Sequence, residues 1–183
     1  MSQLINSLSF LKRVKTILYP TDTVWGLGCD ATNAKAVAKI YKIKGREESK
    51  SLIVLVSSLH MLKQYVSVPK KAIEILKTTK KPTTIIYKKP KGFAKNTIAQ
   101  DGTIAVRIVK DEFCRKLIKR FGKPIVSTSA NISEKPTPKS FLEIDKAILE
   151  SVDYVVNLHK NKVTDTSSRI LRIIGNDIEV LRP

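Results

Sequence analysis

A continuous apolar run at residues 52–56 (LIVLV) constrains the fold of this chain more than any other feature. A strand this apolar is expected to be covered on both faces, as strands are inside α/β sheets. The preceding segment, residues 38–43, has apolar positions spaced as on the packed face of a helix. A helix, a short loop and a buried strand in succession predict an α/β protein.

The loop between these two elements carries three cations, Lys44, Arg46 and Lys50. Cations held close together repel one another, so an anionic ligand is the simplest partner that would relieve them. The alternative interpretation is a solvated basic turn in a lysine-rich protein.

The net charge of the whole chain also favours an anionic ligand. Its 183 residues include 34 Lys plus Arg against 16 Asp plus Glu, a net charge of +18. Such a field attracts polyanions and speeds the capture of anionic small molecules. Nucleic acid and a nucleotide are therefore both candidate partners, and a surface coated with lysine is the competing explanation.

Composition also argues against several classes of protein. No apolar run reaches about 18 residues, so we expect no membrane span, and residues 1–15 lack the layout of a secretion signal. Cys29 and Cys114 are too few for a disulfide framework and fit no zinc motif, and His60 and His159 are isolated. We expect no protein metal site and a reducing, cytoplasmic location.

Apolar runs and capping residues predict the remaining elements. We expect strands over residues 14–18, 83–87, 103–108, 124–126, 154–158, 170–174 and 178–181. We expect helices over residues 33–43, 57–64, 70–77, 111–121 and 141–149. A hairpin turn at residues 175–177 joins the last two strands, and the absence of a linker or repeat predicts one domain over residues 1–183.

Three hydroxyl-rich clusters, residues 21–23, 127–131 and 164–168, are the candidate ligand loops. Their side chains suit phosphate, ribose or carboxylate oxygens, and loops at strand ends line the ligand crevice of open α/β sheets. Arg107, near the end of an apolar strand, is either a ligand clamp or half of a buried ion pair, unless it lies at an exposed edge. Turns in which Ser, Thr and Asp bond their own backbone are the alternative for the clusters.

Five segments, in order along the chain, resemble the motifs of one family. Residues 19–28 (YPTDTVWGLG) resemble PTDTVYGLG, residues 44–46 with 52–54 resemble KGRP…PLIV, residues 103–108 resemble TVAVRVP, residues 127–133 resemble PSANxSG, and residues 166–182 resemble PST…LRPG. By this resemblance the chain is identified as a member of the YrdC/Sua5 family of threonylcarbamoyl-AMP synthases, in its short form without an extra C-terminal domain.

The resemblance implies a twisted, mixed parallel and antiparallel sheet flanked by helices around an electropositive cavity. It implies that L-threonine, bicarbonate and ATP give threonylcarbamoyl-AMP and pyrophosphate. The product then serves N6-threonylcarbamoylation of adenosine 37 in tRNA through separate transfer proteins. Mg²⁺ is expected on the ATP phosphates, without dedicated protein ligands. The rival interpretation is a non-catalytic binder of double-stranded RNA or tRNA that uses the same basic cavity.

The resemblance also assigns residues. The ATP site falls on Arg46, Lys50, Thr103, Ser129, Asn131, Thr137 and Arg182. The threonine site falls on Thr23, Arg107, Ser127 and Ser168. Lys44 and Arg46 are assigned the catalytic role of neutralising charge that develops on the phosphates. The sequence departs from the family pattern at Trp25 for Tyr, at Leu55 for a substrate-contacting His of some members, and at Glu134 for Gly.

Overall fold

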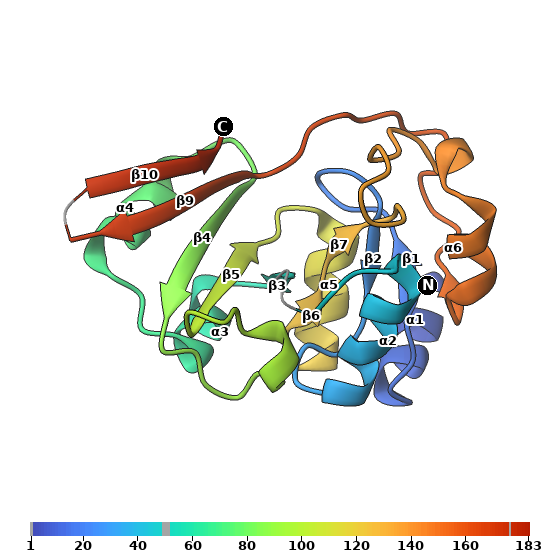
Figure 1. Ribbon diagram of the computed structural model, residues 1–183, viewed down its shortest axis with the longest axis horizontal. Helices are drawn as coiled ribbons and strands as arrows, with labels where there is room; N and C mark the ends of the chain where they lie inside the picture. The colour runs from blue at the N-terminus through green and yellow to red at the C-terminus, as the bar shows by residue number, and fades with distance from the viewer. Residues whose placement is uncertain (1, 49–51, 176) are drawn as a thin grey trace.

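Two β-sheets form the frame of the computed structural model, which describes residues 2–48, 52–175 and 177–183 (Figure 1). The larger has the strand order β10-β9-β4-β5-β3-β6 and the smaller the order β7-β2-β1-β8. The strands of the larger sheet are β3 (Ile53–Val56), β4 (Thr83–Lys88), β5 (Thr103–Ile108), β6 (Ile125–Val126), β9 (Arg169–Ile174) and β10 (Asp177–Arg182). Those of the smaller sheet are β1 (Ile17–Tyr19), β2 (Gly26–Gly28), β7 (Thr128–Ser129) and β8 (Tyr154–Val155).

Both sheets mix parallel and antiparallel pairs. The pairs β3–β5, β4–β9 and β1–β8 are parallel, while β4–β5 and β9–β10 are antiparallel. The predicted mixed α/β architecture is therefore confirmed, although its strands divide between two sheets instead of forming one. Ser127 marks the crossing point, because β6 before it belongs to the larger sheet and β7 after it to the smaller.

Helices flank the sheets (Figure 1). The α-helices are α1 (Ser2–Lys12), α2 (Ala34–Lys44), α3 (Leu59–Tyr65), α4 (Lys70–Thr78), α5 (Glu112–Phe121) and α6 (Lys146–Ser151). Two 3₁₀ turns, η1 (Lys95–Thr97) and η2 (Phe141–Glu143), complete the regular structure of the described residues. Among the described helices, none is long and apolar enough to cross a membrane.

Local sequence explains where the helices begin and end. The side chains of Asn33 and Asp111 accept hydrogen bonds from the amides of Ala36 and Cys114, 3.1 and 2.8 Å away, and so cap α2 and α5. Gly45 ends α2 with φ +55°, a left-handed conformation that glycine adopts without steric cost. This reversal turns the chain out of α2 and starts the loop toward β3.

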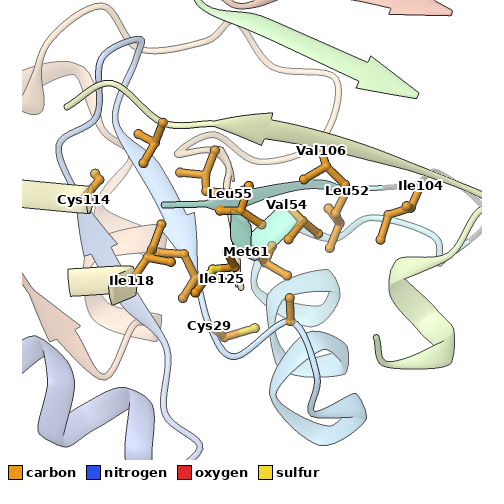
Figure 2. Packing of buried hydrophobic residues seen from close by; sticks show 14 of the residues in the cluster. Cys29, Leu52, Val54, Leu55, Met61, Ile104, Val106, Cys114, Ile118 and Ile125 are labelled. Atoms are coloured by element: carbon orange, nitrogen blue, oxygen red, sulfur yellow. The ribbon is translucent and has the colours of Figure 1, made fainter. Parts of the chain in front are cut away.

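The core lies between the larger sheet and the helices behind it. Figure 2 shows Met61 of α3 beside Val54 of β3, and Ile118 of α5 near Ile125 of β6. In β5, Ile104 and Val106 point to this core, while Ala105 and Arg107 between them face the opposite side of the sheet. The face of the larger sheet opposite the core is thus available for a ligand site.

Several expected elements need correction. Residues 128–129 form strand β7 instead of a loop, because they pair with residues 26–27 of β2. Residues 141–149 do not form one helix: η2 and α6 are separate, and Asp145 caps the second by accepting from the amide of Ala147. Strand β8 ends at residue 155, where residues 154–158 were expected.

Helix α1, which packs against α5, was not predicted from the sequence. Its signal was present, because Leu4, Leu8 and Leu11 repeat at helical spacing. Strand β1 covers residues 17–19, not 14–18, and Val14 lies in a turn with φ +60°. Both the predicted hairpin residue Asn176 and the predicted ligand Lys50 lie outside the described residues.

Candidate functional site: a cavity on the second face of the larger sheet

A cavity of about 320 Å³ opens where the two sheets meet. Its walls come from the loop before β2, from the residues around Ser127, from β5 and from the strands β9 and β10. Eight residues predicted from the sequence line it: Thr23, Arg46, Arg107, Ser127, Ser129, Thr137, Ser168 and Arg182. The structure thus brings together residues that lie up to 159 positions apart, from Thr23 to Arg182.

Arg107 lies at the base of one corner of the cavity. The register of β5 places it between Leu55 of β3 and Thr84 of β4, and its side chain is only 3% exposed. Its Nη1 donates to Oδ1 of Asp22 at 2.6 Å, and its Nη2 donates to the Thr23 hydroxyl at 3.3 Å. Among the described residues, its Nε has no hydrogen-bond partner. Arg107 therefore forms one half of a buried ion pair and also lines the cavity.

Arg182 forms the other side of this corner. Its Nε donates to the carbonyl oxygen of Ser168 at 2.8 Å and its Nη2 to the Ser168 hydroxyl at 3.1 Å. The same hydroxyl lies 2.8 Å from the Thr84 hydroxyl. Burial, and then the positive charge of Arg107, lower the pKa of Arg182. The two guanidinium groups thus share one corner, which suits an anionic group.

Ser127 reaches the cavity through a close contact between strands. A Cβ atom on Gly26 would lie 2.9 Å from the Ser127 hydroxyl oxygen, so glycine is required for this approach. Trp25, beside it, is buried against Phe141 with ring centroids 5.0 Å apart. The indole that replaces the family's tyrosine therefore joins the cavity wall to η2.

Lys44 does not lie in the cavity wall. Its side chain is 1% exposed, and its Nζ donates to the carbonyl oxygens of Ser129 and Asn131 at 2.6 Å each. Burial, and then the charge of Arg46, lower its pKa to about 8. Lys44 is therefore not among the residues that line the cavity, and its side chain instead holds the end of β7 and Asn131. Its catalytic role stays a prediction.

Two further predicted ligands, Thr103 and Asn131, are not among the residues that line this cavity. Thr103 lines a neighbouring groove of about 600 Å³, where its hydroxyl donates to Asp101 at 2.6 Å. Asn131 lines an adjoining hollow of about 260 Å³ that shares Thr137 with the cavity, and its amide donates to the carbonyl oxygens of Ile132 and Lys135. Lys50 lies outside the described residues.

Sequence reasoning missed the apolar part of the cavity. Ile53, Ile86, Ala105, Ile170 and Leu181 line it together with the polar residues. The signal was period-2 alternation, because Ala105 and Arg107 share one face of β5. Leu55, in contrast, belongs to the core, as Figure 2 shows, and does not line the cavity. Among the described residues no three His, Cys, Asp or Glu side chains gather to hold a metal ion.

Fold and cavity define a mixed α/β protein with a small cavity lined by guanidinium, hydroxyl and apolar groups. Residues 9–183 match the profile of the Sua5/YciO/YrdC family, which carries the description "Telomere recombination". The chain belongs to this family.

The chain is also similar to individual proteins. The chain is 37% identical over 180 residues to a putative threonylcarbamoyl-AMP synthase of Methanocaldococcus jannaschii, covering 96% of this chain and 84% of that protein. It is 34% identical over 160 residues to the threonylcarbamoyl-AMP synthase of Pseudoalteromonas translucida, covering 85% and 86% of the two chains.

A solved structure extends the likeness to three dimensions. The chain superimposes on P. abyssi Sua5 in complex with L-threonine with a TM-score of 0.89 at 27% identity. The match covers 98% of this chain and 53% of that one, so this chain spans about half of P. abyssi Sua5.

Proposed function

We propose that this protein is a threonylcarbamoyl-AMP synthase, which makes threonylcarbamoyl-AMP and pyrophosphate from L-threonine, bicarbonate and ATP. Relatives that are 34–37% identical over most of their length carry this name. The observation that carries the proposal is the corner formed by Arg107, Arg182 and Ser168, where two guanidinium groups and a hydroxyl converge.

This corner suits the threonine carboxylate. A guanidinium binds a carboxylate through two parallel N–H···O bonds, and the second cation adds charge. Thr23 and Ser127 supply hydroxyls near it, and the apolar side chains of Ile86 and Ala105 suit the methyl group of threonine. Arg46, Ser129 and Thr137 remain for the phosphates and ribose of ATP.

The reaction then needs no protein nucleophile. The threonine amine attacks bicarbonate carbon to form a carbamate, with loss of water. A carbamate oxygen attacks the α-phosphorus of ATP, the bond to the β-phosphate oxygen breaks, and pyrophosphate leaves. This step makes the enzyme a nucleotidyltransferase. The protein positions two anions against each other and neutralises charge that grows on the phosphates.

Mg²⁺ enters as part of the ATP substrate. Hydroxyl and guanidinium groups supply the polar lining of the cavity over the described residues, and no carboxylate is among the lining side chains. Such a lining fits an ion held by phosphate oxygens and water. We place the enzyme in the cytoplasm, where its two buried free thiols, Cys29 and Cys114, suit reducing conditions. Its product would pass to separate proteins that modify tRNA.

A binder of RNA without catalysis is less well supported. The charge of +18 favours it, but a cavity of about 320 Å³ that mixes hydroxyl and apolar groups fits a small molecule better than a duplex. Binding of tRNA or double-stranded RNA stays a prediction.

An omission assay tests the proposed reaction. Pyrophosphate release from ATP is measured with threonine, bicarbonate or neither left out. We expect release only with both, because the attacking group is their carbamate. Equal release without threonine would refute the proposal, and RNA binding without any threonine-dependent release would favour the rival.

A further inference from the structure

Among the described residues, Asp22 is a carboxylate that contacts the cavity corner through Arg107, and no predicted role covers it. It follows β1 in the loop before β2, and its side chain is mostly buried. Its Oδ1 accepts from Nη1 of Arg107 at 2.6 Å, and its Oδ2 accepts from the backbone amide of Lys110 at 3.1 Å. Both carboxylate oxygens are thus used, and they join the loop to Arg107 and to the end of β5.

The turn that carries Asp22 has hydrogen bonds besides those to Arg107. The neighbouring hydroxyls of Thr21 and Thr23 lie 3.0 Å apart, and that of Thr21 donates to the carbonyl oxygen of Val24 at 2.8 Å. The Lys110 side chain donates to the carbonyl oxygens of Thr79 and Lys80. The carboxylate therefore sits on a rigid turn, as a group that fixes another side chain must.

The atoms that Asp22 uses decide which atoms remain. A guanidinium is planar, and Nε and Nη2 donate along one of its edges, while Nη1 points away from that edge. Asp22 binds Nη1. Along the remaining edge, Nε has no partner among the described residues, and Nη2 has only the long contact to Thr23, which lines the cavity. This edge has two donors in the geometry that binds a carboxylate with two bonds.

We propose that Asp22 is the positioning residue of the threonine site: it binds Nη1 of Arg107 and thereby directs the Nε–Nη2 edge to the substrate carboxylate. This inference rests on the proposed function. Asp22 also acts through its charge. Arg107 and Arg182 share one corner and repel each other, and the Asp22 carboxylate holds Arg107 in place against this repulsion. The competing explanation is an ion pair that only stabilises the fold.

The test compares Asp22→Asn with a matched control, Asp30→Asn. Asp30 is also a buried carboxylate in an ion pair, 3.1 Å from Nζ of Lys123, and does not line the cavity. Calorimetric titration measures threonine and ATP affinity, and thermal unfolding measures stability. We expect Asp22→Asn to weaken threonine binding roughly 10- to 100-fold, since displacing a positioned group by about 1 Å can cost about 100-fold, with ATP affinity nearly unchanged. Asp30→Asn should lower the Tm without weakening threonine binding.

Two more variants separate positioning from stability. If Asp22 acts through Arg107, adding Asp22→Asn to Arg107→Lys should cost no further threonine affinity. Asp22→Glu keeps the charge but moves it by one methylene, so threonine should bind more weakly than to the unchanged protein even where the Tm is normal. This variant also serves if Asp22→Asn does not fold.

The outcomes are distinct. Unchanged threonine affinity in Asp22→Asn, or full affinity in Asp22→Glu, would overturn the positioning role while threonine-dependent pyrophosphate release still supports the proposed function. Failure of that release in the unchanged protein would instead refute the function itself.

Discussion

Arg107 and Lys44 are both buried cations of this chain, and the structure treats them in opposite ways. Arg107 pairs with a carboxylate and lines the cavity, and its Nε has no hydrogen-bond partner among the described residues. Lys44 donates to two backbone carbonyl oxygens and lies behind the cavity wall. A buried charge is tolerated when it is paired or hydrogen-bonded, and the kind of partner decides the role. The carboxylate leaves a guanidinium edge for a ligand, whereas the carbonyl oxygens use the amine to hold a loop.

Arg46 is a third cation to compare with Arg107 and Lys44. Its substitution is expected to have the largest effect, on turnover. It lines the cavity just after the glycine that ends α2. We expect Arg46→Ala to lower turnover about 100- to 1000-fold, the cost of losing one group that stabilises developing charge, with the Tm nearly unchanged. Steady-state pyrophosphate release and thermal unfolding check this. A large fall in Tm with modest loss of turnover would place Arg46 beside Lys44 as a structural cation.

Arg107→Lys tests the cavity side of the comparison. Lysine keeps the charge but lacks the planar fork, so threonine should bind roughly 30- to 150-fold more weakly, the worth of about 2–3 kcal/mol in hydrogen bonds to charged groups. ATP affinity should change far less. Calorimetric titration of each substrate gives both numbers, and equal losses for the two would show that Arg107 does not distinguish them.

Lys44→Met tests the structural role of the buried lysine through the pH dependence of stability. Because burial, then the charge of Arg46, lower the pKa of Lys44 from 10.5 to about 8, the folded protein loses this proton before the unfolded chain does. Below pH 8 both states hold the proton; between pH 8 and 10.5 only the unfolded chain does, so stability rises with pH over this window. The rise is on the order of 3 kcal/mol.

Denaturant unfolding at pH 7.5 and 9.5 measures this effect as the difference between the two proteins. The variant should lack the rise, and its threonine affinity should stay within about threefold of normal, because a side chain behind the wall touches no ligand. Identical pH dependence in both proteins would show that Lys44 keeps an ordinary pKa.

Glu134→Gly gives the smallest effect and tests the loop that Lys44 holds. The amide of Ser133 donates to the carbonyl oxygen of Lys44 at 2.8 Å, and the next residue, Glu134, has φ +69°. A left-handed conformation costs a residue with a side chain about 1–2 kcal/mol, which glycine avoids. We expect the variant to gain about 1 kcal/mol or less, measured by denaturant unfolding. A loss of stability would show that the glutamate side chain compensates for the strain.

Much of the fold could be predicted from the sequence. The apolar run that became β3, the capped helix α5 and the apolar segment that became β5 are local signals, and the structure contains all three. The division into two sheets was not predictable in this way, because it depends on Ser127 lying between β6 and β7 and on pairing between residues about 100 positions apart. Helix α1 was missed although its leucine spacing was visible.

The candidate site shows the same limit. Motifs indicated eight residues that do line one cavity, but they did not distinguish Arg46, which lines it, from Lys44, which lies behind it. The direction of a side chain depends on the helix end at Gly45 and on which carbonyl oxygens lie nearby, and both are properties of the folded chain. Asp22 was visible only as a turn residue, because its partner Arg107 is 85 positions away.

Calorimetric titration of the unchanged protein with L-threonine and with L-threoninamide tests the central claim most directly. The amide differs from threonine in lacking the carboxylate that the Arg107 and Arg182 corner is proposed to bind. We expect threonine to bind and threoninamide to bind at least about 30-fold more weakly, since charge-assisted hydrogen bonds are lost. Equal affinity for the two compounds would show that the corner does not receive the carboxylate and would contradict the proposed site.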